Sequence, residues 1–244
     1  MQRLAIILLA VAVFAAVLLA RLPAAWVLPA LGPRLTCGSV EGTLWRGECS
    51  SARLAGVRLD QLAWQVHPGA LLGGRLSAEL SAQRADAHAS AELSVRWHGP
   101  LHARDLHARL PLEPALMPML PPYITGVLEA NVAHLVVARD GAIEQVQGTL
   151  TVHHLVDSSG SVTPLGSYRL RFPEGPGEPL GQLRDLGGPL WLRGTLRLTA
   201  QPGYVLHARV AARAGASPSL LQGLQYLGAP DGQGRRPFAL AGTY

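Results

Sequence analysis

The chain has 244 residues, of which 48% are hydrophobic and 15% are charged, and its formal net charge is +5. So apolar a composition with so modest a charge excludes a disordered chain, and two cysteines without a three-residue glycine period exclude small disulfide-rich and collagen-like proteins. All 21 basic residues are arginines spread along the chain, with Arg235 and Arg236 the one adjacent pair, so we expect no nucleic-acid partner.

The first predicted element is a membrane anchor at residues 4–22. Residues 4–20 form an uninterrupted apolar run, just long enough for a helix to cross a bilayer. No small-residue cleavage pattern follows the run, which favours an uncleaved anchor over a signal peptide. We therefore predict a cytoplasmic tip at residues 1–3, a single span of the inner membrane, an irregular connector at residues 23–36 and a periplasmic β-rich domain at residues 37–244.

The two cysteines, Cys37 and Cys49, flank a stretch that reads as a pair of short strands. An even cysteine count beyond an export segment is typical of a periplasmic disulfide. Two independently buried thiols remain the alternative. Two cysteines alone do not fill a zinc site.

Period-two alternation of apolar and polar residues dominates the rest of the chain, as in antiparallel strands with one solvated face. It is clearest over residues 61–67, 93–98, 106–110, 145–152, 192–198 and 206–213. The best helix candidate is 217–227, with Ser217 as N-cap and Pro218 as the first helical residue. We predict a mainly β fold of about ten to thirteen strands, an antiparallel meander forming a curled sheet or an incomplete barrel or sandwich.

Three tryptophans carry expectations of their own. Trp64 and Trp97 fall on the apolar phase of predicted strands and are expected in the core. Trp191 falls on the polar phase beside Arg193, which makes it a candidate partner contact. Packing of Trp191 under a neighbouring loop is an equally weighted alternative.

No sequence motif indicates an enzyme. The G-x-S-x-G, P-loop, G-x-G-x-x-G and H-E-x-x-H patterns are absent. His98, His102 and His107 with Asp105 show no recognised metal-ligand spacing, and a solvated face is the better interpretation. We predict no catalytic residue, no cofactor and no metal site.

The order and spacing of short motifs resemble those of type II secretion system protein N. The segments that carry the resemblance include VEGTLWRG at 40–47, LAWQVHP at 62–68, TPLGSYRL at 163–170, LGAPDGQGR at 227–235 and FALAG at 238–242. On this resemblance the residues with expected structural roles are Gly42, Trp45, Gly47, Trp64, Pro68, Gly166, Tyr168, Gly228, Gly234 and Gly242.

The resemblance implies a non-enzymatic inner-membrane component that associates with platform proteins L and M, with the secretin as a further candidate partner. Glycine and tryptophan at strand entries after a single anchor also resemble AsmA-like proteins. That alternative implies a periplasmic lipid-binding or lipid-shuttling module with an apolar groove.

Overall fold

The computed structural model describes residues 14, 17–18, 20–27, 35–54, 57–113, 121–160, 162–175 and 179–243. They divide into two compact units, residues 1–85 and residues 86–244. Each unit is described separately below.

The fold is mainly β, as predicted from the alternation. The described residues form fourteen strands and few short helices, and the strand pairs within each unit are antiparallel. The count exceeds the expected ten to thirteen because two short strands, at residues 35–36 and 39–42, precede the first long one.

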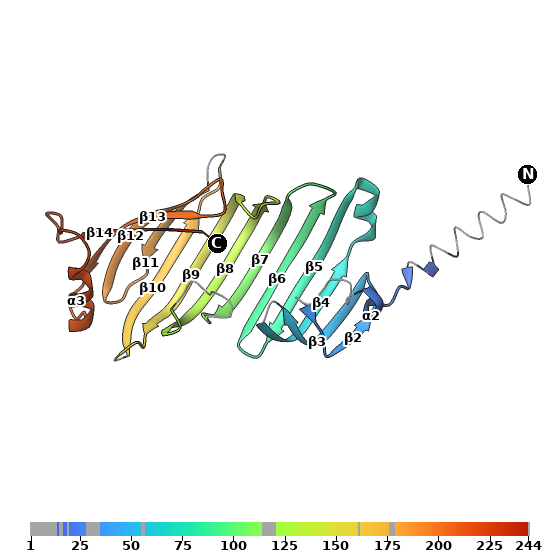
Figure 1. Cartoon of the computed structure of the whole chain (residues 1–244), viewed down its shortest axis with the longest axis horizontal. Helices are drawn as coiled ribbons and strands as arrows, with labels where there is room; N and C mark the ends of the chain where they lie inside the picture. Colours follow the sequence, from blue (N-terminus) through green and yellow to red (C-terminus); the bar gives the residue numbers. More distant parts are fainter. Residues whose placement is uncertain are drawn as a thin grey trace, which may run out of the picture. The chain divides into compact units, whose positions relative to one another are not determined.

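The first unit is a small sheet. Its elements are α2 (Ala24–Val27), β1 (Leu35–Thr36), β2 (Ser39–Gly42), β3 (Arg46–Leu54), β4 (Val57–Val66), the 3-10 helix η2 (Pro68–Gly73) and β5 (Arg75–Arg84). Both short strands pair with β3, which pairs with β4, which in turn pairs with β5 (Figure 1). The long strand β3 therefore holds both short strands in place.

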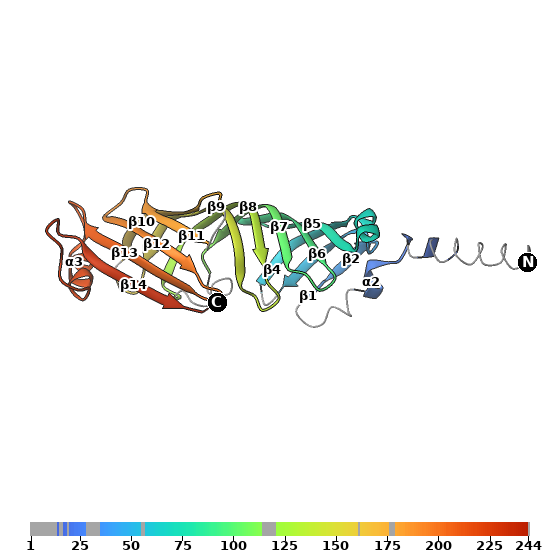
Figure 2. The ribbon, with the colours of Figure 1, turned by 90° about the horizontal axis from the view of Figure 1, so that it is seen from above.

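The second unit is a meander in which each strand lies beside the next (Figure 1). Its elements are β6 (Ala87–Arg96), β7 (Leu101–Pro111), β8 (Ile124–Val137), β9 (Ile143–Asp157), β10 (Thr163–Phe172), β11 (Leu180–Asp185), β12 (Leu190–Leu198), β13 (Tyr204–Ala212), α3 (Pro218–Gln225) and β14 (Arg236–Gly242). The strand β14 ends the order, and in the described residues no strand pairs with its outer edge (Figure 2).

One face of the second unit's sheet is apolar and built from small side chains. Its buried members are mostly alanine and valine, including Ala103, Ala108, Ala130, Ala208 and Val210. Opposed residues on antiparallel strands point to the same side, so these alternating positions gather on one face. Their polar neighbours gather on the other face.

The predicted C-terminal helix is confirmed as α3. The side chain of Ser217 accepts a hydrogen bond from the Leu220 N–H at 3.3 Å, and Pro218 is the first helical residue. None of the α3 side chains is fully buried.

The predicted anchor falls mostly outside the described residues. Among those described, no helix is long and apolar enough to cross a membrane. The connector expected to be irregular at residues 23–36 contains α2 and β1, while residues 28–34 lie outside the described part.

The core expectation for Trp97 is wrong. The strand β6 ends at Arg96, and Trp97 lies in the following turn with 86% of its surface exposed. The next residue, His98, has φ of +77°, which breaks the alternation on which the expectation depended.

Candidate functional site

In the first unit, Trp64 holds the β2–β3 hairpin. Its indole Nε1 donates to the carbonyl oxygens of Thr43 and Leu44, at 3.3 and 3.2 Å. The ring lies across Gly47, its directly opposed residue on β3, where a Cβ would stand 2.6 Å from a ring carbon. Trp64 is thus half-buried by covering a position without a side chain.

The hairpin also requires Gly42. Its φ is +93°, and a Cβ there would lie 2.5 Å from the Arg46 carbonyl oxygen. Both the left-handed backbone and the close approach favour glycine. Trp45 is half-buried within this hairpin, and Pro68 is exposed at the start of η2.

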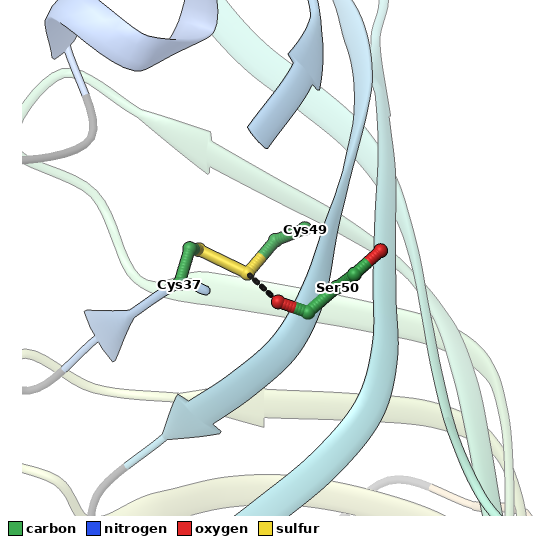
Figure 3. The surroundings of a disulfide bond; sticks show 3 residues. All are labelled: Cys37, Cys49 and Ser50. Carbon is green, nitrogen blue, oxygen red and sulfur yellow. Dashed lines mark hydrogen bonds between the residues drawn. A yellow bond between two sulfur atoms is a disulfide. The ribbon is translucent and has the colours of Figure 1, made fainter. Parts of the chain in front are cut away.

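The structure joins Cys37 and Cys49 in a disulfide, which ties the segment between β1 and β2 to β3 (Figure 3). Their Cα atoms are 5.6 Å apart, and Cys49 is completely buried. The Cys49 sulfur lies 3.9 Å from the Ser50 carbonyl oxygen. An oxidised sulfur carries no hydrogen, so this is a contact rather than a hydrogen bond.

A second group of motif residues lies in the second unit, where β10 begins. Gly166 has φ of +106°, and a Cβ there would lie 2.8 Å from the Gly187 carbonyl oxygen. The Tyr168 hydroxyl donates to the Leu165 carbonyl oxygen at 2.6 Å. Burial raises the pKa of Tyr168 to about 12, and the nearby Asp185 carboxylate adds to this rise. Tyr168 is therefore a neutral packing group at any physiological pH.

Asp185 and Arg213 lock the β11–β12 turn to the end of β13. The Arg213 guanidinium donates to the Asp185 carboxylate and to the Leu190 carbonyl oxygen, the latter at 2.9 Å. Burial pushes the pKa of Asp185 upward, but hydrogen bonds from Leu192 N–H, Arg213 and Gly187 N–H outweigh burial. The pKa of Asp185 therefore lies below its ordinary value.

A third group lies in the loop before β14 and is organised by Asp231. Its carboxylate accepts from the N–H groups of Gln233 and Arg235, both at 2.9 Å, and pairs with Arg209 at 3.3 Å. These backbone hydrogen bonds, that from Arg235 first, lower the pKa of Asp231. Gly234 has φ of +72° in the same turn.

Two further motif glycines flank this loop and β14. The carbonyl oxygen of Gly228 accepts from the Arg236 guanidinium at 3.0 Å. At the end of β14, a Cβ on Gly242 would lie 2.9 Å from the Tyr204 hydroxyl oxygen.

The same loop places a cation over Trp191. The Arg235 guanidinium lies 4.4 Å from the ring centroid, and that of Arg193 lies 5.7 Å away. Trp191 is half-buried on the polar face, covered by an arginine from the loop. Its role as a partner contact stays a prediction.

The arginines that are single in the sequence are aligned by strand register. Arg169 on β10 opposes Arg184 on β11, Arg184 opposes Arg193 on β12, and Arg193 opposes Arg209 on β13. We call these four residues the arginine row. Sequence reasoning missed this cluster because alternation gives the face of each residue but not its partner on the next strand.

On the opposite face of the same strands, a cavity of about 430 Å³ separates α3 from the sheet. Half of its lining residues are leucine, valine or phenylalanine, among them Leu192, Val210, Leu220, Leu224 and Phe238, and the polar lining includes Asp157 and Thr163. Tyr168 also lines it. The volume and lining are those of a small apolar binding pocket.

The histidines weighed as metal ligands lie apart in the structure. His107 Nδ1 lies 2.9 Å from the Asn131 side-chain oxygen, whereas His98 contacts Arg139 at 3.2 Å. Within the described ranges, no three histidine, cysteine or acidic side chains are grouped closely enough to hold a metal ion.

Residues 33–239 match the family described as type II secretion system (T2SS), protein N. A type II secretion system protein N from Aeromonas hydrophila is 28% identical over 236 residues, covering 92% of both chains. The protein of that name from Vibrio cholerae serotype O1 is 29% identical over 212 residues, covering 82% of this chain and 81% of its own. No solved structure matches the chain significantly.

Proposed function

We propose a function from one premise: the chain belongs to the type II secretion system protein N family, which its residues 33–239 match. The chain is a non-enzymatic component of the inner membrane that binds other subunits of the secretion platform. Its β-rich part lies in the periplasm and supports the export of folded proteins from that compartment.

The proposed membrane topology rests on the apolar run and on the disulfide. The apolar run at residues 4–20 anchors the chain, with residues 1–3 in the cytoplasm and residues 37–244 in the periplasm. The disulfide between Cys37 and Cys49 supports this orientation, because structural disulfides persist in the oxidising periplasm and not in the cytoplasm. An anchored subunit meets other anchored subunits at a raised effective concentration.

The observation that carries the binding function is the outer edge of β14. This edge ends the sheet of the second unit within the described residues, so its backbone groups are a template for one more strand. Platform proteins L and M are the proposed partners at this edge, and the secretin is a further candidate.

The test is co-purification of the full chain with L and M from detergent-solubilised membranes. Ala239→Pro removes a backbone donor from the middle of β14 and should weaken recovery of the partner. Ala214→Pro is the matched control, because it places a proline in a turn outside β14. In this turn the Ala216 N–H donates to the Arg213 carbonyl oxygen, and Gly215 has φ of +86°. Proline is favoured at the position that Ala214 holds in such a turn. Equal recovery of L and M with both variants would refute binding through β14.

Lipid binding is the second candidate function, and the cavity under α3 is the observation that favours it. Its size suits one acyl chain, and most of its lining surface is apolar. Mass spectrometry of lipids retained by the purified chain tests it. Retained lipid that is lost on Leu224→Gln would support this function, and a chain purified without lipid would contradict it.

A further inference from the structure

The arginine row brings four like charges to directly opposed positions on neighbouring strands, about 4.8 Å apart from strand to strand. Like charges directly opposite each other lower the stability of a sheet. The row is therefore unfavourable for the unit alone, and an anionic occupant would relieve it.

The surroundings of the row are almost free of compensating acids. The next row on the same face consists of Arg171, Gln182, Thr195 and His207. On β10–β13 neither row contains an acidic residue. Within the described residues Arg184 has no ion-pair partner, and Asp231 from the loop reaches only Arg209 at the end of the row. The face therefore presents a net positive charge to solvent.

The row ends in a hollow beside β14. A depression of about 550 Å³ is lined by Arg193, Thr195, His207, Arg209, Pro237 and Ala239, together with backbone between them. The two β14 residues continue the two rows, because Pro237 opposes Arg209 and Ala239 opposes His207. Their short side chains leave the space between the long arginines and the outer edge of β14 open.

The backbone of β14 determines which residues face outward. Pro237 opposes Arg209 and has no N–H to donate. These two residues therefore fit a pair that exchanges no backbone hydrogen bonds between β13 and β14. Gly194 lies very close to Ala208, as directly opposed residues do when they form a pair without ladder hydrogen bonds. The backbone groups of Ala208 therefore point to β14 and not to β12, which agrees with the position of Pro237. Residues 237, 239 and 241 therefore direct their backbone groups to the free edge.

The two faces of β14 differ in chemistry. Pro237 and Ala239 lie on the face of the arginine row, while Phe238 and Leu240 oppose Ala208 and Leu206 on the apolar face. Leu240 is 47% exposed. A strand added to β14 alternates its side chains between these two faces.

We propose that the partner segment that adds to β14 has acidic side chains at every second position, facing the arginine row, and apolar side chains between them, facing Phe238 and Leu240. The inference rests on the proposed function, since it specifies what the strand at that edge must carry. Arginine forks recognise carboxylates with two parallel hydrogen bonds, which gives the acidic positions their specificity.

Other anionic partners fit this face less well. Binding of single-stranded nucleic acid relies on aromatic rings that stack on bases, and the ring of Trp191 is already covered by Arg235. A membrane surface would contact the arginine row but would neither fill the hollow beside β14 nor pair with the free backbone groups of that strand.

The experiment measures binding of fluorescent eight-residue peptides to the full chain in detergent by anisotropy. One peptide alternates valine with glutamate, a second valine with glutamine, and a third valine with lysine. The glutamate peptide should bind about tenfold more tightly than the glutamine peptide, with the difference shrinking as salt rises. Arg193→Glu with Arg209→Glu should abolish this preference and admit the lysine peptide.

The control pair is Arg53→Glu with Arg58→Glu, because these exposed arginines also oppose each other on neighbouring strands but lie in the first unit. It should leave the peptide preference unchanged. The salt dependence on the unaltered chain remains a test even if a variant folds poorly.

The outcomes separate this inference from the proposed function. Equal binding of glutamate and glutamine peptides, with both lost on Ala239→Pro, would overturn the acidic pattern and leave strand addition intact. Glutamate binding insensitive to Ala239→Pro would overturn the alternating strand. Tighter binding of anionic vesicles or of an oligonucleotide to the row would also overturn it in favour of that partner.

Discussion

Reduction of the Cys37–Cys49 disulfide should destabilise the first unit by about 3 kcal/mol. The bridge joins residues 12 apart, and the loop-entropy estimate for a ring of this size is about 3 kcal/mol. The effect should be largest at β1, because this strand is only two residues long and pairs only with β3 among the described strands.

The assay is urea unfolding of the full chain in detergent, followed by tryptophan fluorescence with and without a phosphine reductant. Trp45 lies in the turn between β2 and β3, and Trp64 lies on the neighbouring strand β4, so both report on this unit. With a urea dependence of about 1–3 kcal/mol per molar, the midpoint of this transition should fall by about 1–3 M.

The double variant Cys37→Ala with Cys49→Ala is the control, and its midpoint should not respond to the reductant. If the oxidised and the reduced chain have the same midpoint, the bridge does not stabilise the first unit. Two free thiols counted on the denatured, unreduced protein would show that the bridge does not form.

Three more predictions concern stability. Asp185→Asn should lower the free energy of unfolding in urea by about 1–3 kcal/mol at pH 7. Because folding lowers the pKa of Asp185, the stabilisation by its carboxylate is present above about pH 4 and is lost as pH falls further. The free energies of unfolding of variant and parent should therefore converge in acid. Arg184→Thr should raise the melting temperature, since it removes like charges opposite two arginines, a gain of about 0.2–1 kcal/mol that added salt should reduce. Gly47→Ala should lower stability by about 1–3 kcal/mol because its Cβ would lie 2.6 Å from both the Glu41 carbonyl oxygen and the Trp64 ring, and the cost of this substitution should be smaller when it is measured in a Trp64→Leu background.

Much of the fold could be predicted from local pattern. The alternation in residues 192–198 and 206–213 places each side chain on a face, and consecutive strands pair because short turns join them. The helix α3 was readable from Ser217 and Pro218 for a similar local reason. The prediction that Trp97 lies in the core was wrong because a turn residue can continue a strand's alternation by chance, and only the backbone shows where the strand ends.

The candidate site was less predictable because it depends on register. Arg169, Arg184, Arg193 and Arg209 are separated by loops of different lengths, so their alignment is fixed by turn geometry and not by spacing. The cover over Trp191 depends likewise on how Asp231 folds its loop, which the sequence shows only as a glycine-rich stretch.

We propose that another subunit of the secretion machine adds a strand to β14. The most direct test is photo-cross-linking in cells, with benzoylphenylalanine in place of Ala239 on β14 or, as a control, of the exposed Gln65 on β4. Strand addition at β14 should give a strong cross-link from position 239 to a platform subunit and little from position 65. No cross-link at 239, or equal cross-links at both positions, would contradict it.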